Sequence, residues 1–400
     1  MEGSTIFSSL LVLKDYCEIE NFRGWDPYDG LNSKVFQATP LKKWDIARLI
    51  LIQTFKRNPI NLRKIFLIPK EYNAKGIALL LTGYCNLYKY WLKTRNLQFG
   101  NEKELSGKIH FLSELLIQLQ SKGYSGSCWG YNFDWQARRL FMFPKNTPTV
   151  VATSFCATSL MDAYEITNEQ QYLNVALSSA YFILTDLKRT QKEKGFLFSY
   201  SPLEGNNTVY NASLLGSKLL SYCYYYTKNK DYKIVARKSI EACIQAQKRD
   251  GSWCYGELPA QNWIDSFHTG YNLDGLMVYQ KCTGDNSFAK NIESGFNFYI
   301  KNFFMEDGTP KYYHNETYPI DIHCPAQLFV VLSSLKKFTE YSMLAEKVLN
   351  WTIINMQDEK GYFYYQLRKV FSSKIPYMRW SNSFMFYAMS YYLLEYLHAE

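Results

Sequence analysis

The chain has 400 residues, of which 47% are hydrophobic and 20% are charged, so it carries ample material for a large globular core. Its net charge of +9 is spread along the chain, and the lack of a long Lys/Arg run argues against a nucleic-acid-binding protein. No window reaches the roughly 18 uninterrupted apolar residues of a membrane helix. We therefore expect neither a nucleic-acid partner nor a membrane span.

The nine cysteines are scattered and form no CxxC pair, which favours a reducing compartment over a disulfide framework. The apolar run 6–13 lacks the preceding basic residue of a signal peptide. Together these observations predict a cytoplasmic protein.

In chain order, residues 1–40 begin with this short apolar segment and continue into an aromatic loop with Asp-Pro and Asp-Gly pairs, 24–33. Apolar residues at helical spacing then predict helices over 41–56, 73–92 and 102–120. The stretch 121–148 is a long loop rich in aromatic residues, Gly and Pro. Loops of this length in compact domains are often functional.

After this loop the predicted helices come in pairs. One helix of each pair is apolar nearly all round, as a buried helix is; these are 149–166, 209–227, 263–282, 320–338 and 379–397. The other carries Lys and Glu on one side; these are 170–188, 231–248, 286–304 and 340–356. Similar loops join the pairs, each with a glycine followed by aromatic residues, at Gly195, Gly251, Gly308 and Gly361. Their spacings of 56, 57 and 53 residues (251 − 195, 308 − 251, 361 − 308) indicate an internal repeat.

With the three earlier helices, this repeat predicts six inner helices alternating with six outer ones. Such a set closes into a double ring, so we expect an all-α protein with the (α/α)6 toroid fold. No linker interrupts the pattern, and we expect a single domain over residues 1–400 in which residues 1–40 form a loop segment contributing to the cleft. The inner helices would all start at one end of the ring, where their loops line a common cleft.

The stretch 263–276 has the greatest density of reactive side chains, among them Asp265, His268 and Tyr271. The start of a helix disfavours a protonated imidazole, which would keep His268 able to accept a proton. Asp265, three residues earlier, could orient the ring. The alternative is a buried histidine that bonds a neighbouring loop carbonyl and has a purely structural role.

Other candidates stand near the predicted inner-helix starts. We expect catalytic roles for Asp134, Asp321, His323 and Arg379 beside Asp265 and His268, and substrate contacts from Tyr28, Trp129, Trp135, Arg138, Asn211, Trp253, Trp263, Tyr271, His314, Trp380 and Asn382. For each of them the alternative is a helix cap or a loop hydrogen bond, since Asp, Asn and Ser are common N-caps. Three histidines in one predicted cleft, at 268, 314 and 323, are the stronger observation.

Three chemistries fit these residue types. In the first, a His or Tyr abstracts the proton next to the carboxylate of an acidic sugar, and Arg138 or Arg379 neutralises that carboxylate, as an epimerase or lyase requires. In the second, Asp134 with Asp265 or Asp321 hydrolyses a glycosidic bond. In the third, Asp265, His268, His323 and Cys254 or Cys324 bind zinc, for which the spacing gives the weakest support. A non-catalytic glycan-binding toroid is a further alternative.

Four stretches together resemble the bacterial VpsJ-type polysaccharide-biosynthesis proteins of the terpenoid-cyclase-like and six-hairpin α/α-toroid class: DPYDGLNS (26–33), WGYNFDWQ (129–136), WIDSFHTGYNLDGL (263–276) and RWSNSFMFYAMS (379–390). The resemblance implies a role in making or tailoring capsular polysaccharide, exopolysaccharide or O-antigen. It implies an oligo- or polysaccharide substrate and, as further partners, other polysaccharide-assembly enzymes. The class includes glycosidases, unsaturated-uronyl hydrolases, polysaccharide lyases and the helical domain of glucuronyl C5-epimerases, so sugar chemistry leads and we expect no cofactor and no metal. Its prenyltransferases and lanthionine cyclases use zinc, which keeps the third chemistry open.

Overall fold

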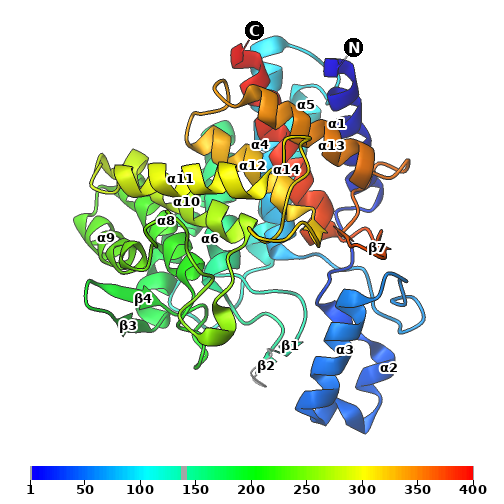
Figure 1. Cartoon of the computed structure of the whole chain (residues 1–400), viewed down its shortest axis with the longest axis horizontal. Helices are drawn as coiled ribbons and strands as arrows, with labels where there is room; N and C mark the ends of the chain where they lie inside the picture. Colours follow the sequence, from blue (N-terminus) through cyan, green and yellow to red (C-terminus); the bar gives the residue numbers. More distant parts are fainter. Residues whose placement is uncertain (1, 137–141, 400) are drawn as a thin grey trace.

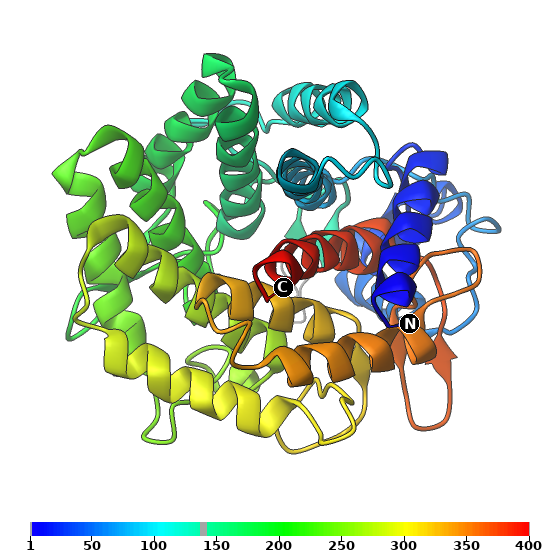
Figure 2. The same ribbon diagram turned by 90° about the horizontal axis from the view of Figure 1, so that it is seen from above.

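The inner ring of the protein consists of helices that are buried on nearly every side. The computed structural model describes residues 2–136 and 142–399. Within this part of the chain, the inner helices are α4 (Ala74–Thr94), α6 (Val150–Thr167), α8 (Tyr210–Thr227), α10 (Ser266–Thr283), α12 (His323–Ser334) and α14 (Ser383–Ala399). Each packs against the next, and α14 packs against α4, which closes the ring (Figures 1 and 2).

A second set of helices surrounds this ring (Figure 2). Among the described residues, the outer helices are α1 (Glu2–Ile19), α5 (Glu102–Gln118), α7 (Gln170–Tyr181), α9 (Lys230–Gln245), α11 (Ala289–Phe303) and α13 (Ser342–Met356). Helices α5, α7, α9, α11 and α13 each pack on the inner helix that precedes them in the chain, and α1 packs on α14. The prediction of an all-α (α/α)6 toroid is confirmed.

Side-chain chemistry explains which helices are inside. In α4 every residue from Ala74 to Leu87 is buried, because neighbours cover it on all sides. In α11 the buried residues recur every three or four positions, such as Ile292, Phe296 and Tyr299, so only one face is covered. No helix in the described part of the chain has the length and apolarity needed to cross a membrane.

Two predictions near the N-terminus are wrong. We expected residues 1–40 to form a loop segment, but Glu2–Ile19 is helix α1 and serves as the sixth outer helix. Its buried residues Ile6, Leu10, Leu13 and Cys17 follow a 4-3-4 helical spacing, which is hard to recognise as an outer helix because its partner α14 lies at the other end of the chain. Conversely, we counted 41–56 among the twelve ring helices, whereas α3 (Asp45–Arg57) lies outside both rings.

The repeated loop glycines explain the register of the outer ring. Gly251 has φ +91°, and a Cβ added there would overlap the backbone carbonyl oxygen of Ser294 in α11. Gly361, also at φ +91°, meets the carbonyl oxygen of Val12 in α1 in the same way. The loop before each new hairpin thus lies directly on the backbone of the next outer helix, and α1 takes that place for the last loop.

Gly251→Ala is expected to destabilise the protein by about 2–4 kcal/mol, because a left-handed backbone and a steric overlap both oppose the added methyl. The matched control is Gly284→Ala at the C-terminal cap of α10, which has φ +71° but no atom within 4 Å of the added Cβ. That variant should lose only about 1 kcal/mol. Denaturant unfolding of both variants measures the difference, and equal losses would contradict the close-packing explanation.

Shorter elements fill the loops. They are η1 (Asp29–Asn32), α2 (Lys34–Gln37), η2 (Pro40–Lys43), η3 (Phe182–Asp186), η4 (Pro259–Gln261), η5 (Met378–Asn382), β1 (Trp135–Gln136), β2 (Met142–Phe143), β3 (Arg189–Gln191), β4 (Phe196–Phe198), β5 (Ile320–Asp321), β6 (Gln366–Leu367) and β7 (Ser372–Ser373). Strands β1–β2 and β3–β4 are antiparallel pairs, and β5–β6–β7 form a small sheet in which Asp321 pairs with Gln366.

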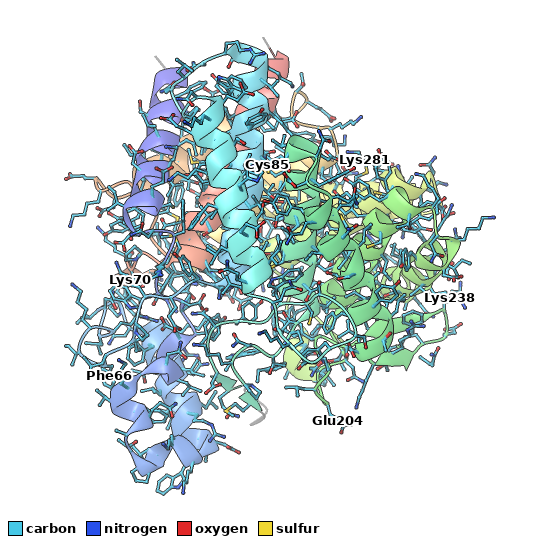
Figure 3. All side chains as sticks on the ribbon, turned by 180° about the vertical axis from the view of Figure 1, so that it is seen from behind. Phe66, Lys70, Cys85, Glu204, Lys238 and Lys281 are labelled. Atoms are coloured by element: carbon cyan, nitrogen blue, oxygen red, sulfur yellow. The ribbon has the colours of Figure 1, made fainter. Side chains whose placement is uncertain are left out.

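The segment containing α2 and α3 projects from one end of the rings (Figures 1 and 3). Phe66 packs edge-on against Phe55 of α3, with ring centroids 5.2 Å apart. Lys70, at the junction in Figure 3, pairs with Glu20 and stands over the ring of Trp25. This segment therefore forms a wall beside the starts of the inner helices.

Candidate active site

The starts of the inner helices bring an aromatic and imidazole cluster together at one end of the ring. The Phe267 ring at the start of α10 contacts both histidine rings, His268 at 4.2 Å and His323 at 5.1 Å between centroids. It also lies 6.1 Å from the ring of Trp380 in η5. Three successive inner-helix starts, those of α10, α12 and η5–α14, thus contribute to one site.

His268 and Asp265 form a hydrogen-bonded dyad. His268 Nδ1 lies 2.7 Å from Asp265 Oδ2, and the His268 side chain is 20% exposed while Asp265 is buried. The same carboxylate caps α10, because its Oδ1 accepts the backbone N–H of His268 at 3.0 Å. Trp263 Nε1 also donates to Oδ2, at 2.9 Å. A carboxylate that holds Nδ1–H leaves Nε2 as the basic nitrogen of a neutral imidazole.

The second histidine is buried and neutral. His323 Nδ1 lies 3.7 Å from Asp321 Oδ1, and burial lowers the pKa of His323 to about 4, although Asp321 acts in the opposite direction. Asp321 accepts hydrogen bonds from Trp380 Nε1 at 2.9 Å and from Gln366 Nε2 at 3.1 Å. His323 is therefore unprotonated at neutral pH and packs tightly against Phe384, with ring centroids 3.9 Å apart.

Arg379 is already neutralised by the protein. Its guanidinium donates to both oxygens of Asp26, at 2.5 and 2.8 Å, and both side chains are 4% exposed. Asp29 of the same loop pairs with the buried Arg63. We expected Arg379 to neutralise a substrate carboxylate; the structure contradicts this, because Asp26 occupies the planar fork of donors that would bind it. Residues 26–29 instead anchor the N-terminal loop to η5.

Lys75 is a feature that we did not predict from the sequence. It lies at the start of α4 and donates to Tyr271 Oη at 3.2 Å. Its ammonium also stands 4.3 Å from the ring centre of Phe155 and 5.2 Å from that of Phe384. Since α4 and α10 are opposite one another in the ring, the Lys75 side chain reaches across the lumen to Tyr271, whose ring lies 6.0 Å from that of His268. Burial, with Arg379 nearby, lowers the pKa of Lys75 well below its usual value.

A cavity of about 310 Å³ opens beside this cluster. It is lined by Gln53, Lys56, Arg57, Tyr312, Tyr313, Tyr318, Pro319, Asp321, Tyr365, Gln366, Arg368 and Trp380. The backbone joins it to the dyad, because Ser266 N–H donates to Tyr312 O at 2.9 Å and Asp265 is bridged to Tyr313. The cavity has the size and aromatic lining of a small-molecule site.

Four predicted ligand contacts lie in or near this region. Tyr28 packs 5.7 Å from Trp380 and 6.1 Å from Trp135, and its hydroxyl accepts from Lys56 Nζ at 2.7 Å. Trp263 stacks on Tyr255 at 4.6 Å. The Tyr271 ring lies 6.0 Å from that of His268, and the Trp380 ring lies 4.3 Å from that of His323. A ligand contact by these four side chains stays a prediction.

Two predicted tryptophan contacts are wrong because both side chains belong to the core. Trp129 is 0% exposed and donates through Nε1 to the carbonyl of Leu116, near the end of α5. Trp253 is 2% exposed and donates to the carbonyl of Cys243, near the end of α9. Each satisfies a helix-terminal carbonyl in its own repeat, so neither ring presents a face to a ligand.

Other candidates serve the scaffold. Asp134 accepts the backbone N–H of Lys145 at 2.6 Å within the β1–β2 hairpin. Asn382 is buried and bonds the backbones of Phe363 and Tyr377. The backbone occupies both polar atoms of Asn382, so we do not assign it to ligand binding. The catalytic role of Asp134 stays a prediction.

The remaining candidates are not joined to the dyad by any interaction in the described structure. His314 packs 6.1 Å from Phe298 of outer helix α11. Asn211 is buried at the start of α8, with its side-chain oxygen unpartnered. Arg138 lies outside the described residues.

The proposed zinc ligands do not converge. In the described part of the chain, no group of three or more His, Cys, Asp and Glu side chains is placed to hold a metal ion. Asp265, His268 and His323 are engaged as described above, and Cys324 is buried in α12. Asp265 and His268 are hydrogen-bonded to each other, an arrangement that suits acid–base chemistry by imidazole.

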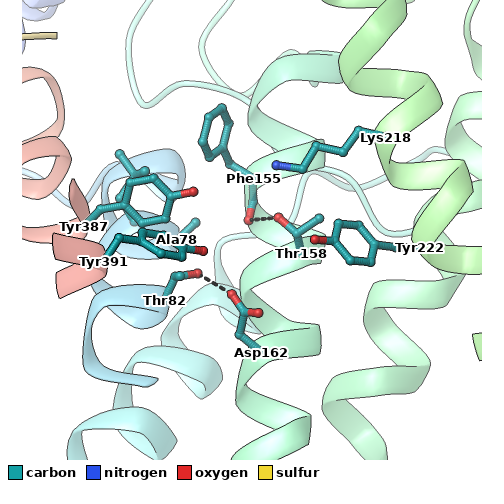
Figure 4. A pocket seen from close by; sticks show the side chains of 10 residues that line it. Ala78, Thr82, Phe155, Thr158, Asp162, Lys218, Tyr222, Tyr387 and Tyr391 are labelled. Carbon is teal, nitrogen blue, oxygen red and sulfur yellow. Dashed lines mark hydrogen bonds between the residues drawn. The ribbon is translucent and has the colours of Figure 1, made fainter. Parts of the chain in front are cut away.

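A second, smaller cavity lies between inner helices (Figure 4). Its volume of about 30 Å³ suits one or two water molecules. Thr82 Oγ1 donates to Asp162 Oδ2 there at 2.7 Å, and Lys218 on its wall pairs with Asp274 at 2.6 Å. All residues that line this cavity belong to the inner helices α4, α6, α8 and α14, so it is part of the ring's interior.

Sequence reasoning missed Lys75 and the cationic residues of the larger cavity. Lys75 carried a signal, since it is the single charge in the apolar start of a predicted buried helix. Lys56, Arg57 and Arg368 carried none, because isolated basic residues on a helix and a loop are ordinary surface features.

The fold places the chain among α/α-toroid proteins. No family model matches the sequence, and no curated protein matches it. Among solved structures, the chain is similar to a cellobiose 2-epimerase from Bacillus thermoamylovorans, with a TM-score of 0.63 and 13% identity over 82% of this chain and 90% of that one. It is also similar to a GH76 α-mannanase from Bacteroides thetaiotaomicron, with a TM-score of 0.61 and 13% identity over 82% and 87%.

A third similar structure covers the chain almost completely. It is an unsaturated glucuronyl hydrolase from Streptococcus agalactiae, with a TM-score of 0.59 and 11% identity over 98% of this chain and 91% of that one. At these identities the likeness shows the shared toroid fold.

Proposed function

We propose that this protein is a carbohydrate-active enzyme that abstracts a proton from carbon in an acidic saccharide, in an epimerase- or lyase-like reaction. The observation that carries the proposal is the His268–Asp265 dyad, with its 2.7 Å hydrogen bond, at the aromatic end of the ring. An imidazole fixed through Nδ1 and partly exposed has the form of a general base. The proton it removes lies next to the sugar carboxylate, where the resulting carbanion is stabilised.

The fold supports the substrate class. The similar structures include an epimerase that acts on cellobiose and a hydrolase of unsaturated glucuronyl groups. The aromatic rings around the dyad, Tyr255, Trp263 and Trp380, suit the apolar faces of sugars. We extend the proposal to biosynthesis of capsular polysaccharide, exopolysaccharide or O-antigen in the cytoplasm, beside other polysaccharide-assembly enzymes, on the resemblance of the four sequence stretches to VpsJ-type proteins.

Glycoside hydrolysis is the second candidate. Asp265 and Asp321 stand at the starts of neighbouring helices α10 and α12. Each accepts two or more hydrogen bonds from N–H groups, among them Trp263 Nε1 on Asp265 and Gln366 Nε2 on Asp321. Both carboxylates are buried and engaged by these donors, whereas the His268 ring is partly exposed. The dyad therefore supports proton abstraction better than hydrolysis.

Incubation with uronate oligosaccharides in D2O tests the proposal. An epimerase should introduce one deuterium at the carbon next to the carboxylate, which mass spectrometry and NMR detect. A lyase should instead generate the ultraviolet absorbance of a conjugated double bond. New reducing ends without either signal would establish hydrolysis, and binding without any product would establish a glycan-binding protein; both results would overturn proton abstraction.

A further inference from the structure

We infer that the 310 Å³ cavity between α3 and the β5–β6–β7 sheet is the subsite for the acidic group of the saccharide, with Lys56, Arg57 and Arg368 as its cationic wall. This inference rests on the proposed function. It assigns the recognition of the carboxylate to the segment outside the toroid, in place of the arginine that we expected to supply it.

Charge is the first argument. Three cationic side chains face one carboxylate, Asp321, in the lining of the cavity. Two of them donate hydrogen bonds to neutral groups: Lys56 Nζ to Tyr28 Oη at 2.7 Å, and Arg368 Nε to Gln366 Oε1 at 2.9 Å. Among the described residues, none of the three forms an ion pair. The cavity thus has an excess positive charge that an anion would balance.

Two buried arginines, Arg379 and Arg63, support this assignment by elimination. A carboxylate needs charge-assisted donors to be bound tightly. Arg379 gives its donors to Asp26, and Arg63 gives its own to Asp29. Both are buried, so their charges are cancelled within the protein. The cavity cations form no ion pair within the described residues, and the same cavity is lined by Tyr312 and Tyr313, which the backbone joins to the dyad.

The lining also indicates a sugar as the carrier of the charge. Five aromatic residues line the cavity beside the cations: Tyr312, Tyr313, Tyr318, Tyr365 and Trp380. Tyr318 is 43% exposed at its margin. Flat aromatic rings next to cationic donors suit a ring with an apolar face and a carboxylate. The occupant that we propose is therefore a uronate residue of an oligosaccharide.

Binding experiments separate this subsite from the chemistry. The protein as it exists is titrated calorimetrically with trigalacturonate and with the neutral trisaccharide obtained by reducing its carboxyl groups. We expect the acidic trisaccharide to bind at least about tenfold more tightly, and Arg57→Gln and Arg368→Gln each to weaken it about tenfold. The neutral trisaccharide should bind all proteins alike. Lys369→Gln removes an exposed charge next to Arg368 and outside the cavity, and serves as the matched control.

Three other binding results would overturn the inference. Equal binding of the two trisaccharides, or equal losses in Lys369→Gln and Arg368→Gln, overturns the carboxylate subsite. Inorganic phosphate or a single-stranded oligonucleotide that competes at a similar concentration overturns the assignment to a sugar. Arg57 is exposed, so its variant tests the charge without disturbing the fold. Binding is measured separately from the reaction. If the wild-type protein binds the acidic trisaccharide selectively but shows no deuterium exchange, the proposed function is refuted and the subsite still stands.

Discussion

His268→Gln should lower the rate of solvent-deuterium exchange into a uronate oligosaccharide by about a hundredfold or more, the usual contribution of a general base. Glutamine keeps a polar side chain of similar reach near Asp265 Oδ2 but has no basic nitrogen. The variant should unfold at the wild-type temperature and bind trigalacturonate with wild-type affinity. The measurement is the exchange rate at saturating saccharide.

Two controls define the role of this histidine. His110→Gln removes another hydrogen-bonded histidine, whose Nδ1 lies 3.0 Å from Tyr172 Oη between the outer helices α5 and α7, and should leave exchange unchanged. Asp265→Asn keeps an efficient N-cap for α10 but loses the charge that orients the imidazole, so it should slow exchange without unfolding the helix. Full exchange by stably folded His268→Gln protein would show that His268 is structural.

Lys75→Met and Lys218→Met should change stability in opposite directions. Both lysines are buried on inner helices, at 4% and 7% exposure. Lys218 pairs with Asp274 at 2.6 Å, and its removal leaves a buried carboxylate unpaired, at a cost of about 3–5 kcal/mol. Within residues 2–136 and 142–399, the contacts of the Lys75 ammonium are a hydroxyl and aromatic rings, so methionine relieves a desolvated amine and should stabilise the fold by about 1 kcal/mol. Denaturant unfolding at pH 7 measures both.

The Lys75 effect should depend on pH. Burial lowers the pKa of Lys75 in the folded state, whereas the unfolded chain keeps a value of about 10.4. Between the two values the unfolded state binds more protons, so this lysine makes the protein more stable as pH rises. The advantage of Lys75→Met should therefore shrink toward pH ~10. A variant that is less stable than wild type at pH 7 would contradict this account and assign Lys75 a structural bond to Tyr271.

The repeat could be recognised because its cause is local. Each hairpin needs one helix apolar on all sides, one apolar on a single face, and a loop glycine that lies on the next outer helix; Gly251 and Gly361 show this directly. The ring closure could not be recognised in the same way. Helix α1 finds its place only through α14, at the far end of the chain, and α3 has an ordinary helical pattern although it packs outside the ring.

The candidate site likewise combines local features that the sequence predicts with long-range contacts that it does not. Asp265 and His268 are one helical turn apart, so their spacing alone brings them together at the cap of α10. Arg379 was equally prominent in the sequence, but Asp26, more than 350 residues away, takes up its charge. Trp129 and Trp253 lie in aromatic loops of the kind that bind sugars, yet each donates a hydrogen bond to a carbonyl near the end of an outer helix.

The sequence by itself determined the helical hairpins, their number to within the exchange of α1 for α3, and the dyad at the start of α10, because apolar periodicity, loop glycines and i, i+3 spacing act over a few residues. Only the tertiary structure decided which charges are cancelled and which remain free. Ion pairs such as Arg379–Asp26 and cavities such as the one between Arg57 and Arg368 depend on segments that are remote in the chain and meet only when the ring closes.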